Sequence, residues 1–291
     1  MKKLRVAVLG SGNIGTDLLI KIQRSEYLDC VLFVGRNLSS PGMAKAIAMG
    51  VKVSDESIHA IEKDPDSVDL VFDATSAKDA AYHWSILERL GKIVVDMTPA
   101  KLGGLCIPAV NLDEAVKQRN VNMITCGGQA SIPMAYAIGK TQKDIKYIEV
   151  VSSIASRSAG PATRLNLDEY IDTTEMGLSF FSNVKKTKAI LNLNPADPCV
   201  DMQTTIFAQV ENPDMKALTK EVDIMIEAIR KYVPGYSLLV SPIYENGRIV
   251  IMVKAQGLGD YLPKFAGNLD IINCAAIAVA EQYSKVQNNI S

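Results

Sequence analysis

Short, fully apolar runs alternate with amphipathic helical patterns over the first 125 residues. Strands that are apolar on both faces and joined by helices form parallel sheets covered on both sides. Right-handed crossovers then place the ligand at the carboxyl ends of the strands. The predicted strands are residues 5–9, 30–34, 51–53, 70–74, 93–96 and 121–125, and the predicted helices are residues 14–25, 43–49, 56–64 and 80–90. We expect an α/β fold in which residues 1–125 form a Rossmann-like, doubly wound domain that binds a dinucleotide.

Beyond residue 140 the strands become longer and more alternating. This pattern is typical of a mixed or antiparallel sheet with helices on one face. The predicted strands are residues 147–154, 189–193, 205–210, 236–243 and 248–255, and the predicted helices are residues 167–181 and 215–232. We expect residues 126–267 to form an α+β catalytic and oligomerisation domain. The Ala- and Ile-rich helix within residues 268–291 should pack back onto the first domain.

Charge and composition argue against several kinds of partner. The 31 Lys and Arg residues balance 32 Asp and Glu, so the chain lacks a basic surface for nucleic acid or an anionic membrane. The longest apolar stretch, residues 271–280, is too short to span a bilayer. Five scattered cysteines without CxxC spacing and only two histidines predict no disulfide framework and no metal site. We expect a reduced, cytoplasmic protein.

A glycine motif follows the first predicted strand and opens a predicted helix, and it reads Gly10-Ser11-Gly12-Asn13-Ile14-Gly15. Gly10 permits the tight turn, Gly12 lets a pyrophosphate approach the backbone, and Gly15 allows close packing of helix and strand. The N–H groups at the start of the helix favour phosphate binding. A Gly-rich turn without a ligand is the alternative, but this context favours a dinucleotide site.

The end of the second strand bears on the type of dinucleotide. NAD-binding domains usually carry Asp or Glu there, whereas this chain reads Val34-Gly35-Arg36-Asn37. Arg36 could stack on adenine, bind the 2′-phosphate of NADP, or lie in a solvated loop. We expect NAD, with NADP as the alternative.

Hydroxyl residues follow two central strands, at Thr75, Ser76 and Thr98. They suit a cleft for the nicotinamide ribose, and each equally suits a helix cap or a turn. The polar stretch at residues 156–164, which carries two arginines, suits phosphate binding or closure over a cofactor, and it also suits a surface loop.

Cys126 follows the strand at residues 121–125 and precedes two glycines. We expect Pro133 in the first turn of a helix. Nearby N–H groups and a positive helix end should lower the pKa of this thiol and expose its sulfur. We also expect N–H groups near Gly127 and Gly128 to hold an oxyanion. Most cysteines are small buried hydrophobes, which is our interpretation of Cys30, Cys106, Cys199 and Cys274.

Four segments together resemble the acylating acetaldehyde dehydrogenases that partner 4-hydroxy-2-oxovalerate aldolases in the meta-cleavage pathways of aromatic compounds. They are residues 10–18, 122–130 and 158–164, and Tyr261-Leu262-Pro263 with residues 267–271. The most specific segment is Thr125-Cys126-Gly127-Gly128-Gln129-Ala130, and the resemblance covers residues 3–285. It implies a semialdehyde-dehydrogenase-like fold.

The resemblance also implies a reaction in which an aldehyde, NAD+ and coenzyme A give acyl-CoA and NADH. Cys126 matches the family's acyl-thioester nucleophile. The nucleotide contacts that it implies are Ser11, Gly12, Asn13, Ile14, Arg157, Ser158, Ala159, Gly160, Pro161, Ala162, Thr163, Arg164, Leu165 and Asn268. It further implies a homo-oligomer and an aldolase partner. The helix at residues 215–232 and residues 261–265 could present a surface to that partner, or could fill the core or a homodimer face.

The chain departs from the family pattern at two positions. Ala162 stands where the family usually has glycine, which costs strain if that position needs a positive φ. Thr204 stands where the family has an Asp that is a candidate acid or base, and Asp201 lies three residues earlier. The sequence therefore does not identify the residue that transfers protons in the reaction.

Two other functions fit the same motifs. One is a phosphorylating semialdehyde dehydrogenase of similar fold, which typically uses a histidine in its second domain, whereas His59 and His83 both lie in the first. The other is a non-enzymatic NAD(H)-binding regulator in which Cys126 senses redox state.

Overall fold

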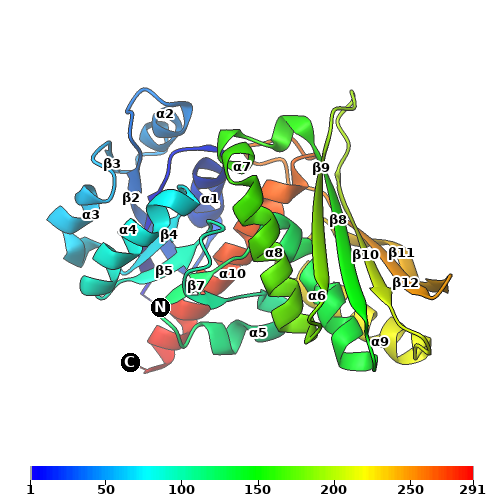
Figure 1. The fold of residues 1–291 in the computed structure, drawn as a ribbon. Helices are drawn as coiled ribbons and strands as arrows, with labels where there is room; N and C mark the ends of the chain where they lie inside the picture. Colours follow the sequence, from blue (N-terminus) through cyan, green and yellow to red (C-terminus); the bar gives the residue numbers. More distant parts are fainter. Residues whose placement is uncertain (1, 291) are drawn as a thin grey trace.

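The computed structural model describes residues 2–290, apart from the side chains of residues 161, 162, 289 and 290. Two sheets lie on opposite sides of the molecule with helices between and around them (Figure 1). The predicted α/β class, with a parallel sheet and a second, mixed sheet, is confirmed. In the described part of the chain no helix combines the length and the apolar character that crossing a membrane requires.

The first sheet has seven strands in the order β3-β2-β1-β4-β5-β7-β6, and every neighbouring pair is parallel. Its strands are β1 (Leu4–Leu9), β2 (Leu28–Val34), β3 (Val53–Ser54), β4 (Leu70–Asp73), β5 (Ile93–Asp96), β6 (Gly104–Leu105) and β7 (Asn120–Asn122). The order reverses between β1 and β4, which is where open α/β sheets bind their ligands.

Helices cover both faces of this sheet because alternate residues of its strands point to opposite sides. Val6 and Val8 of β1 join the cluster that contains α1 and α10, whereas Ala7 and Leu9 join the one that contains α3 and α4. The helices of this half are α1 (Asn13–Arg24), α2 (Pro41–Ala48), α3 (His59–Lys63), α4 (Ala77–Arg89) and α5 (Pro108–Ala115), with a 3-10 turn at Pro65–Ser67. The sequence patterns did not predict β6 or α5.

The second sheet has five strands in the order β11-β12-β10-β8-β9, antiparallel except for the parallel pair β8–β9. Its strands are β8 (Tyr147–Ala155), β9 (Thr187–Asn194), β10 (Met202–Gln209), β11 (Tyr236–Glu245) and β12 (Arg248–Ala255). The accompanying helices are α6 (Cys126–Thr141), α7 (Pro161–Leu165), α8 (Leu167–Ser182) and α9 (Met215–Arg230), with a 3-10 turn at Ser156–Ser158. The mixed sheet is as predicted.

The start of α6 corrects one expectation. We predicted a strand through residue 125 and a helix beginning near Pro133, but β7 ends at Asn122 and the helix begins at Cys126. Thr125 is its N-cap, because the Thr125 hydroxyl accepts a hydrogen bond from Gly128 N–H at 2.8 Å. Pro133 lies inside the helix rather than at its start.

Helix α10 (Gly267–Ile290) returns to the first sheet, and in Figure 1 it runs from between the two sheets to the edge where both chain termini lie. Asn273 Nδ2 of α10 donates to the Ile14 carbonyl at 3.2 Å and to Asp17 of α1 at 2.7 Å. Ser291, the last residue of the segment expected to pack here, lies outside the described residues.

The two segments considered as a partner surface, the helix at residues 215–232 and residues 261–265, pack largely against the rest of the chain. The apolar residues of α9, such as Leu218, Val222 and Ile229, are fully buried in the core. Tyr261 N–H lies 3.4 Å from Asp17 Oδ1, so that loop packs on α1. The buried faces of these two segments are therefore not available to a partner.

Candidate active site

A cleft-like cavity opens at the carboxyl ends of the first sheet, where the two halves of the chain meet, and it holds about 620 Å³ of empty space if the open solvent at its mouth is included. Its wall combines residues that follow β1, β4, β5 and β7 with residues from α7, α8 and α10. The lining residues are Ile14, Ala74, Thr75, Ser76, Met97, Thr98, Pro99, Ile124, Thr125, Cys126, Thr163, Asn166, Tyr170, Asn268, Leu269 and Ile272. The structure thus brings together Ile14 of the glycine motif, Cys126, Thr163 and Asn268, which the sequence analysis selected separately.

The glycine motif has the geometry that a pyrophosphate needs. Gly10 has φ = +119°, and a Cβ on Gly15 would lie 1.9 Å from the Gly10 carbonyl oxygen, so both positions require glycine. A Cβ on Gly12 would meet nothing within 4 Å, so open space lies above this residue. Gly12 is the N-cap of α1 and no side chain caps that helix, which leaves its first N–H groups to a ligand.

Two buried polar groups in the cavity wall also fit a cofactor. Both side-chain polar atoms of Asn268 lack a hydrogen-bond partner although the residue is 1% exposed, and the Thr98 hydroxyl is likewise buried without a partner. Such groups cost free energy unless a ligand or water satisfies them. An amide and a hydroxyl here suit the carboxamide and ribose of a nicotinamide nucleotide. Ser76 is the N-cap of α4, so the helix cap that we considered as its alternative role is observed.

A strained turn places Cys126 in the cavity. Ile124 has φ = +63°, which is unfavourable for a β-branched residue. The turn is held because Ile124 N–H donates to Asn122 Oδ1 at 2.8 Å. Asn122 in turn donates through Nδ2 to Asp96 Oδ2 and to the Thr98 carbonyl, both at 2.9 Å. The ends of two neighbouring strands, β5 and β7, therefore fix the position from which α6 begins.

The environment of the Cys126 thiol differs from our expectation. We expected an exposed sulfur with a lowered pKa, but Cys126 is only 9% exposed and burial raises its pKa. Hydrogen bonds from Tyr170 and from Gly127 N–H oppose this effect without reversing it. The penalty for placing a thiolate in an apolar site therefore outweighs the helix N-terminus, and the prediction of a lowered pKa is wrong.

The N–H groups proposed for the oxyanion are already engaged. Gly127 N–H donates to Tyr170 Oη at 2.9 Å, and Gly128 N–H donates to the Thr125 hydroxyl. Tyr170 Oη also lies 3.6 Å from Cys126 Sγ. The sequence analysis missed Tyr170, because nothing in a single helical pattern marks one tyrosine as facing a cysteine that lies 44 residues away.

A line of buried polar residues lies beneath the cavity at the ends of β4 and β5. Asp73 accepts from the Thr75 hydroxyl, and its other oxygen lies 2.8 Å from His83 Nδ1. Asp96 is the register partner of Asp73. Burial, reinforced by the nearby charge of Asp73, raises the pKa of Asp96 to about 7. His83 is thus a partner of Asp73 and does not line the cavity.

The segment at residues 157–165, which we predicted to contact the nucleotide, is partly helical. Arg157, Ser158 and Ala159 form and end a 3-10 turn, Gly160 is the N-cap of α7, and Thr163 reaches the cavity. Arg164 donates to the Ala159 and Ser156 carbonyls, both at 3.0 Å, so it also folds the segment onto itself. Leu165 is 82% exposed.

Two members of this segment are described by their backbone alone. The side chains of Pro161 and Ala162 lie outside the described residues. The backbone at both positions belongs to helix α7, so the positive φ considered for Ala162 does not arise.

The two residues considered for the acid–base role make their polar contacts outside the cavity. The Thr204 hydroxyl is buried and lies 3.0 Å from the Ser152 hydroxyl. Asp201 accepts from Gln256 Nε2 at 3.2 Å and lies 3.8 Å from Lys254 Nζ. Neither residue lines the cavity.

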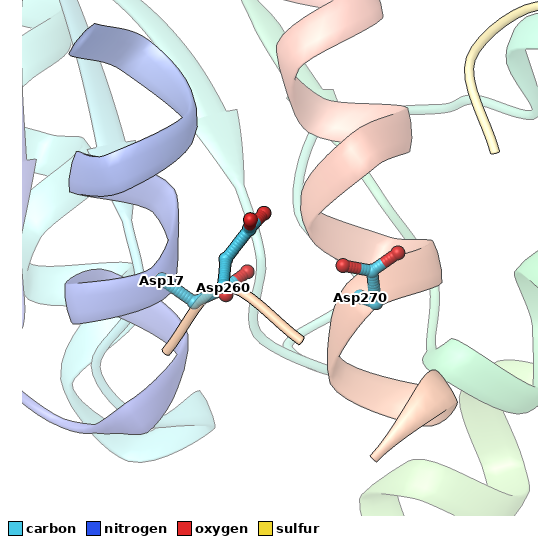
Figure 2. Close-up of side chains that lie close together, drawn as sticks. All are labelled: Asp17, Asp260 and Asp270. Atoms are coloured by element: carbon cyan, nitrogen blue, oxygen red, sulfur yellow. The ribbon is translucent and has the colours of Figure 1, made fainter. Parts of the chain in front are cut away.

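One cluster of carboxylates lies outside the cavity, where Asp17, Asp260 and Asp270 converge from α1, the 260 loop and α10 (Figure 2). The Lys21 ammonium lies 2.7 Å from Asp17, 2.9 Å from Asp260 and 2.8 Å from Asp270. This ammonium, together with Arg24 at Asp260, offsets most of the negative charge of the cluster, and it takes the place that a metal ion would need.

Solved structures with the same overall fold include semialdehyde dehydrogenases. Aspartate semialdehyde dehydrogenase II of Vibrio cholerae matches with a TM-score of 0.63 and 15% identity, covering 99% of each chain. The enzyme of Candida albicans, solved with NADP, matches with a TM-score of 0.65 and 12% identity, covering 96% of this chain and 100% of that one. The fold is therefore that of the semialdehyde dehydrogenases.

Sequence relatives identify the family. The family model for prokaryotic acetaldehyde dehydrogenase, dimerisation, matches residues 126–263. The acetaldehyde dehydrogenase of Spirochaeta aurantia is 61% identical over 98% of this chain and 96% of its own length. That of Pectobacterium atrosepticum is 58% identical over 98% and 97% of the two chains. The chain belongs to the acetaldehyde dehydrogenase family, as the sequence resemblance implied, and the dimerisation region indicates an oligomer.

Proposed function

We propose that this protein oxidises acetaldehyde with NAD+ and transfers the acetyl group to coenzyme A, with Cys126 as the nucleophile. The observation that carries the proposal is the position of the thiol. Of the described residues that line the cavity, Cys126 is the one cysteine, and the same cavity reaches the end of the glycine motif. A covalent thioester and a hydride acceptor can therefore meet in one place.

The chemistry divides between the cofactor and the chain. Cys126 Sγ attacks the carbonyl carbon and forms a hemithioacetal. A nicotinamide bound here would supply the hydride acceptor, and loss of the hydride together with the hydroxyl proton would convert the adduct to a thioester. Apolar wall residues such as Ile14, Ile124 and Ile272 exclude water and protect the thioester from hydrolysis. The thiol of coenzyme A would then attack the thioester and take the acyl group, and its proton would return to the sulfur of Cys126, which is the leaving group.

The residues expected to hold the nucleotide remain those chosen from the sequence. Gly10–Gly15 would bind the pyrophosphate, the segment 157–165 would close over it, and Asn268 would bind the nicotinamide end. Open space above Gly12 and the unpartnered amide of Asn268 support these roles. Arg36 is exposed just beyond β2, where it can meet adenine or a 2′-phosphate. We therefore keep NAD as the cofactor, with NADP as an alternative.

We also propose how the chain divides into functional units and where in the cell the protein works. Residues 1–125 with 268–291 form the nucleotide-binding unit and residues 126–267 the catalytic and oligomerisation unit, a division that the two sheets support. The free cysteines suit the reducing cytoplasm.

A 4-hydroxy-2-oxovalerate aldolase is the proposed partner, because direct transfer would protect a reactive aldehyde. Interception of all the intermediate by an aldehyde trap in a mixture of the two enzymes would contradict such transfer.

The reaction is tested by assaying acetaldehyde under NAD+ and NADP+, each with coenzyme A or phosphate as acyl acceptor. We expect NADH formation that requires coenzyme A. Equal turnover with phosphate would instead support a phosphorylating dehydrogenase. Stoichiometric thiol oxidation without turnover would support a redox sensor.

A further inference from the structure

The thiol of Cys126 needs a partner that can move its proton. Burial raises the pKa of this thiol, so the sulfur begins the reaction protonated and cannot attack until the proton leaves. The groups that act on its pKa, besides burial, are the Tyr170 hydroxyl and backbone N–H groups at the start of α6. Among the described residues that line the cavity, only Cys126 and Tyr170 carry titratable side chains.

The hydrogen bonds around Tyr170 orient its phenol toward the sulfur. Gly127 N–H donates to the phenol oxygen at 2.9 Å, so this oxygen acts as an acceptor there and keeps its own hydrogen to donate. Cys126 Sγ lies 3.6 Å from the same oxygen. A Cβ on Gly127 would lie 2.2 Å from Tyr170 Oη, so glycine at this position is what allows the contact. Burial raises the pKa of Tyr170 well above its usual value, which keeps the phenol protonated.

The two residues that the sequence analysis considered for the acid–base role are engaged elsewhere. Thr204 is hydrogen-bonded to Ser152, and Asp201 is paired with Lys254 and Gln256. We propose that Tyr170 is the acid–base residue of this enzyme and relays the proton of Cys126 to the carbonyl oxygen of the aldehyde. This inference rests on the proposed thioester chemistry.

The step balances without any further reactant. The S–C bond forms as the S–H bond breaks, and the thiol proton passes to Tyr170 Oη. The phenol proton passes at the same time to the carbonyl oxygen, which takes up the π electron pair. The products are a neutral hemithioacetal and a regenerated phenol. The phenol also remains hydrogen-bonded to the new hydroxyl group, which stabilises charge that develops on that oxygen.

Tyr170→Phe tests the relay because it removes only the hydroxyl. Acid–base catalysis contributes about 100-fold or more, so kcat should fall by at least that factor while NAD+ binding stays within about threefold. In the enzyme without cofactor, the pH midpoint of thiol alkylation should move to higher pH, because the thiolate loses a hydrogen-bond donor. Tyr244→Phe is the control, since the Tyr244 hydroxyl bonds the Val210 carbonyl on the second sheet.

Gly127→Ala tests the same contact from the other side if Tyr170→Phe does not fold. Its methyl group must displace the phenol, so the loss of kcat and the alkylation shift should recur. A folded variant of either kind that keeps full turnover and an unchanged alkylation midpoint would overturn the role of Tyr170. Absence of an acyl adduct on Cys126 of the parent enzyme would instead overturn the proposed function, so the two failures are distinguishable.

Discussion

At Gly12 the backbone meets open space although the surrounding motif is tightly packed. A Cβ there would contact nothing within 4 Å, whereas one on Gly15 would collide with the Gly10 carbonyl. The three motif glycines therefore have different tasks. Gly10 and Gly15 are required by the fold, and Gly12 is required only if a ligand approaches its backbone.

Gly12→Val separates these tasks. Its backbone, at φ = −79° and ψ = −168°, accepts a branched side chain, so the variant should fold, with only the small loss of thermal stability that a valine N-cap brings. The affinity for NAD+ should fall by at least about tenfold, or about 1.4 kcal/mol, because the side chain keeps the pyrophosphate away from the N–H groups. Calorimetric titration measures this loss. Unchanged affinity of the folded variant for both NAD+ and NADP+ would assign the loop another role.

At the scale of helices and strands, the ends of β4, β5 and β7 are more polar than their interiors. Asp73, Asp96 and Asn122 lie at matching register positions, and Asn122 holds the turn that leads to Cys126. Burial and the neighbouring Asp73 raise the pKa of Asp96 to about 7, compared with about 4 in an unfolded chain. The folded state thus keeps a proton that the unfolded state loses between these pH values.

The free energy of unfolding should therefore fall as the pH rises from about 4 to about 7. Asp96→Asn removes this titration, so the stability of the variant relative to the parent should rise with pH across the same window. Urea denaturation at several pH values measures the difference, with exposed Asp223→Asn as the control. A difference that does not change with pH would show that Asp96 does not titrate there.

Element positions were predictable where local chemistry alone decides them. β5 and β12 match their predicted ranges because apolar runs bounded by turn residues mark buried strands. The start of α6 was mispredicted because Pro133 is typical of a first turn, whereas the Thr125 cap and the packing of the whole helix between the sheets decide its start. The contact of Tyr170 with Cys126 could not be predicted, since it depends on how α8 packs against α6.

At the scale of the whole molecule, a buried ion network joins segments that lie far apart in the sequence. Lys21 of α1 pairs with Asp260 and with Asp270 of α10, and its side chain is only 4% exposed. Arg24 also pairs with Asp260. No sequence pattern predicted this network, because its members are brought together only when α10 returns to α1. It fixes the helix that carries Asn268 against the helix that carries the glycine motif.

Lys21→Met should lower the free energy of unfolding by about 3–5 kcal/mol, because it leaves three carboxylates in a mostly buried site without their ammonium. Lys45→Met, at an exposed position of α2, should change it by no more than about 0.5 kcal/mol. Denaturant titration of both variants provides the comparison. A loss below about 1 kcal/mol for Lys21→Met would mean that the network does not hold α10 in place.

The central claim, that Cys126 carries the acyl group, is tested most directly by mass spectrometry of the enzyme after mixing with NAD+ and acetaldehyde in the absence of coenzyme A. We predict an acetyl adduct on the peptide that contains Cys126, together with a burst of NADH that matches the number of active sites. The adduct should disappear when coenzyme A is added and should not form in Cys126→Ser. NADH formation with no adduct on Cys126, or an adduct that persists in Cys126→Ser, would contradict the account.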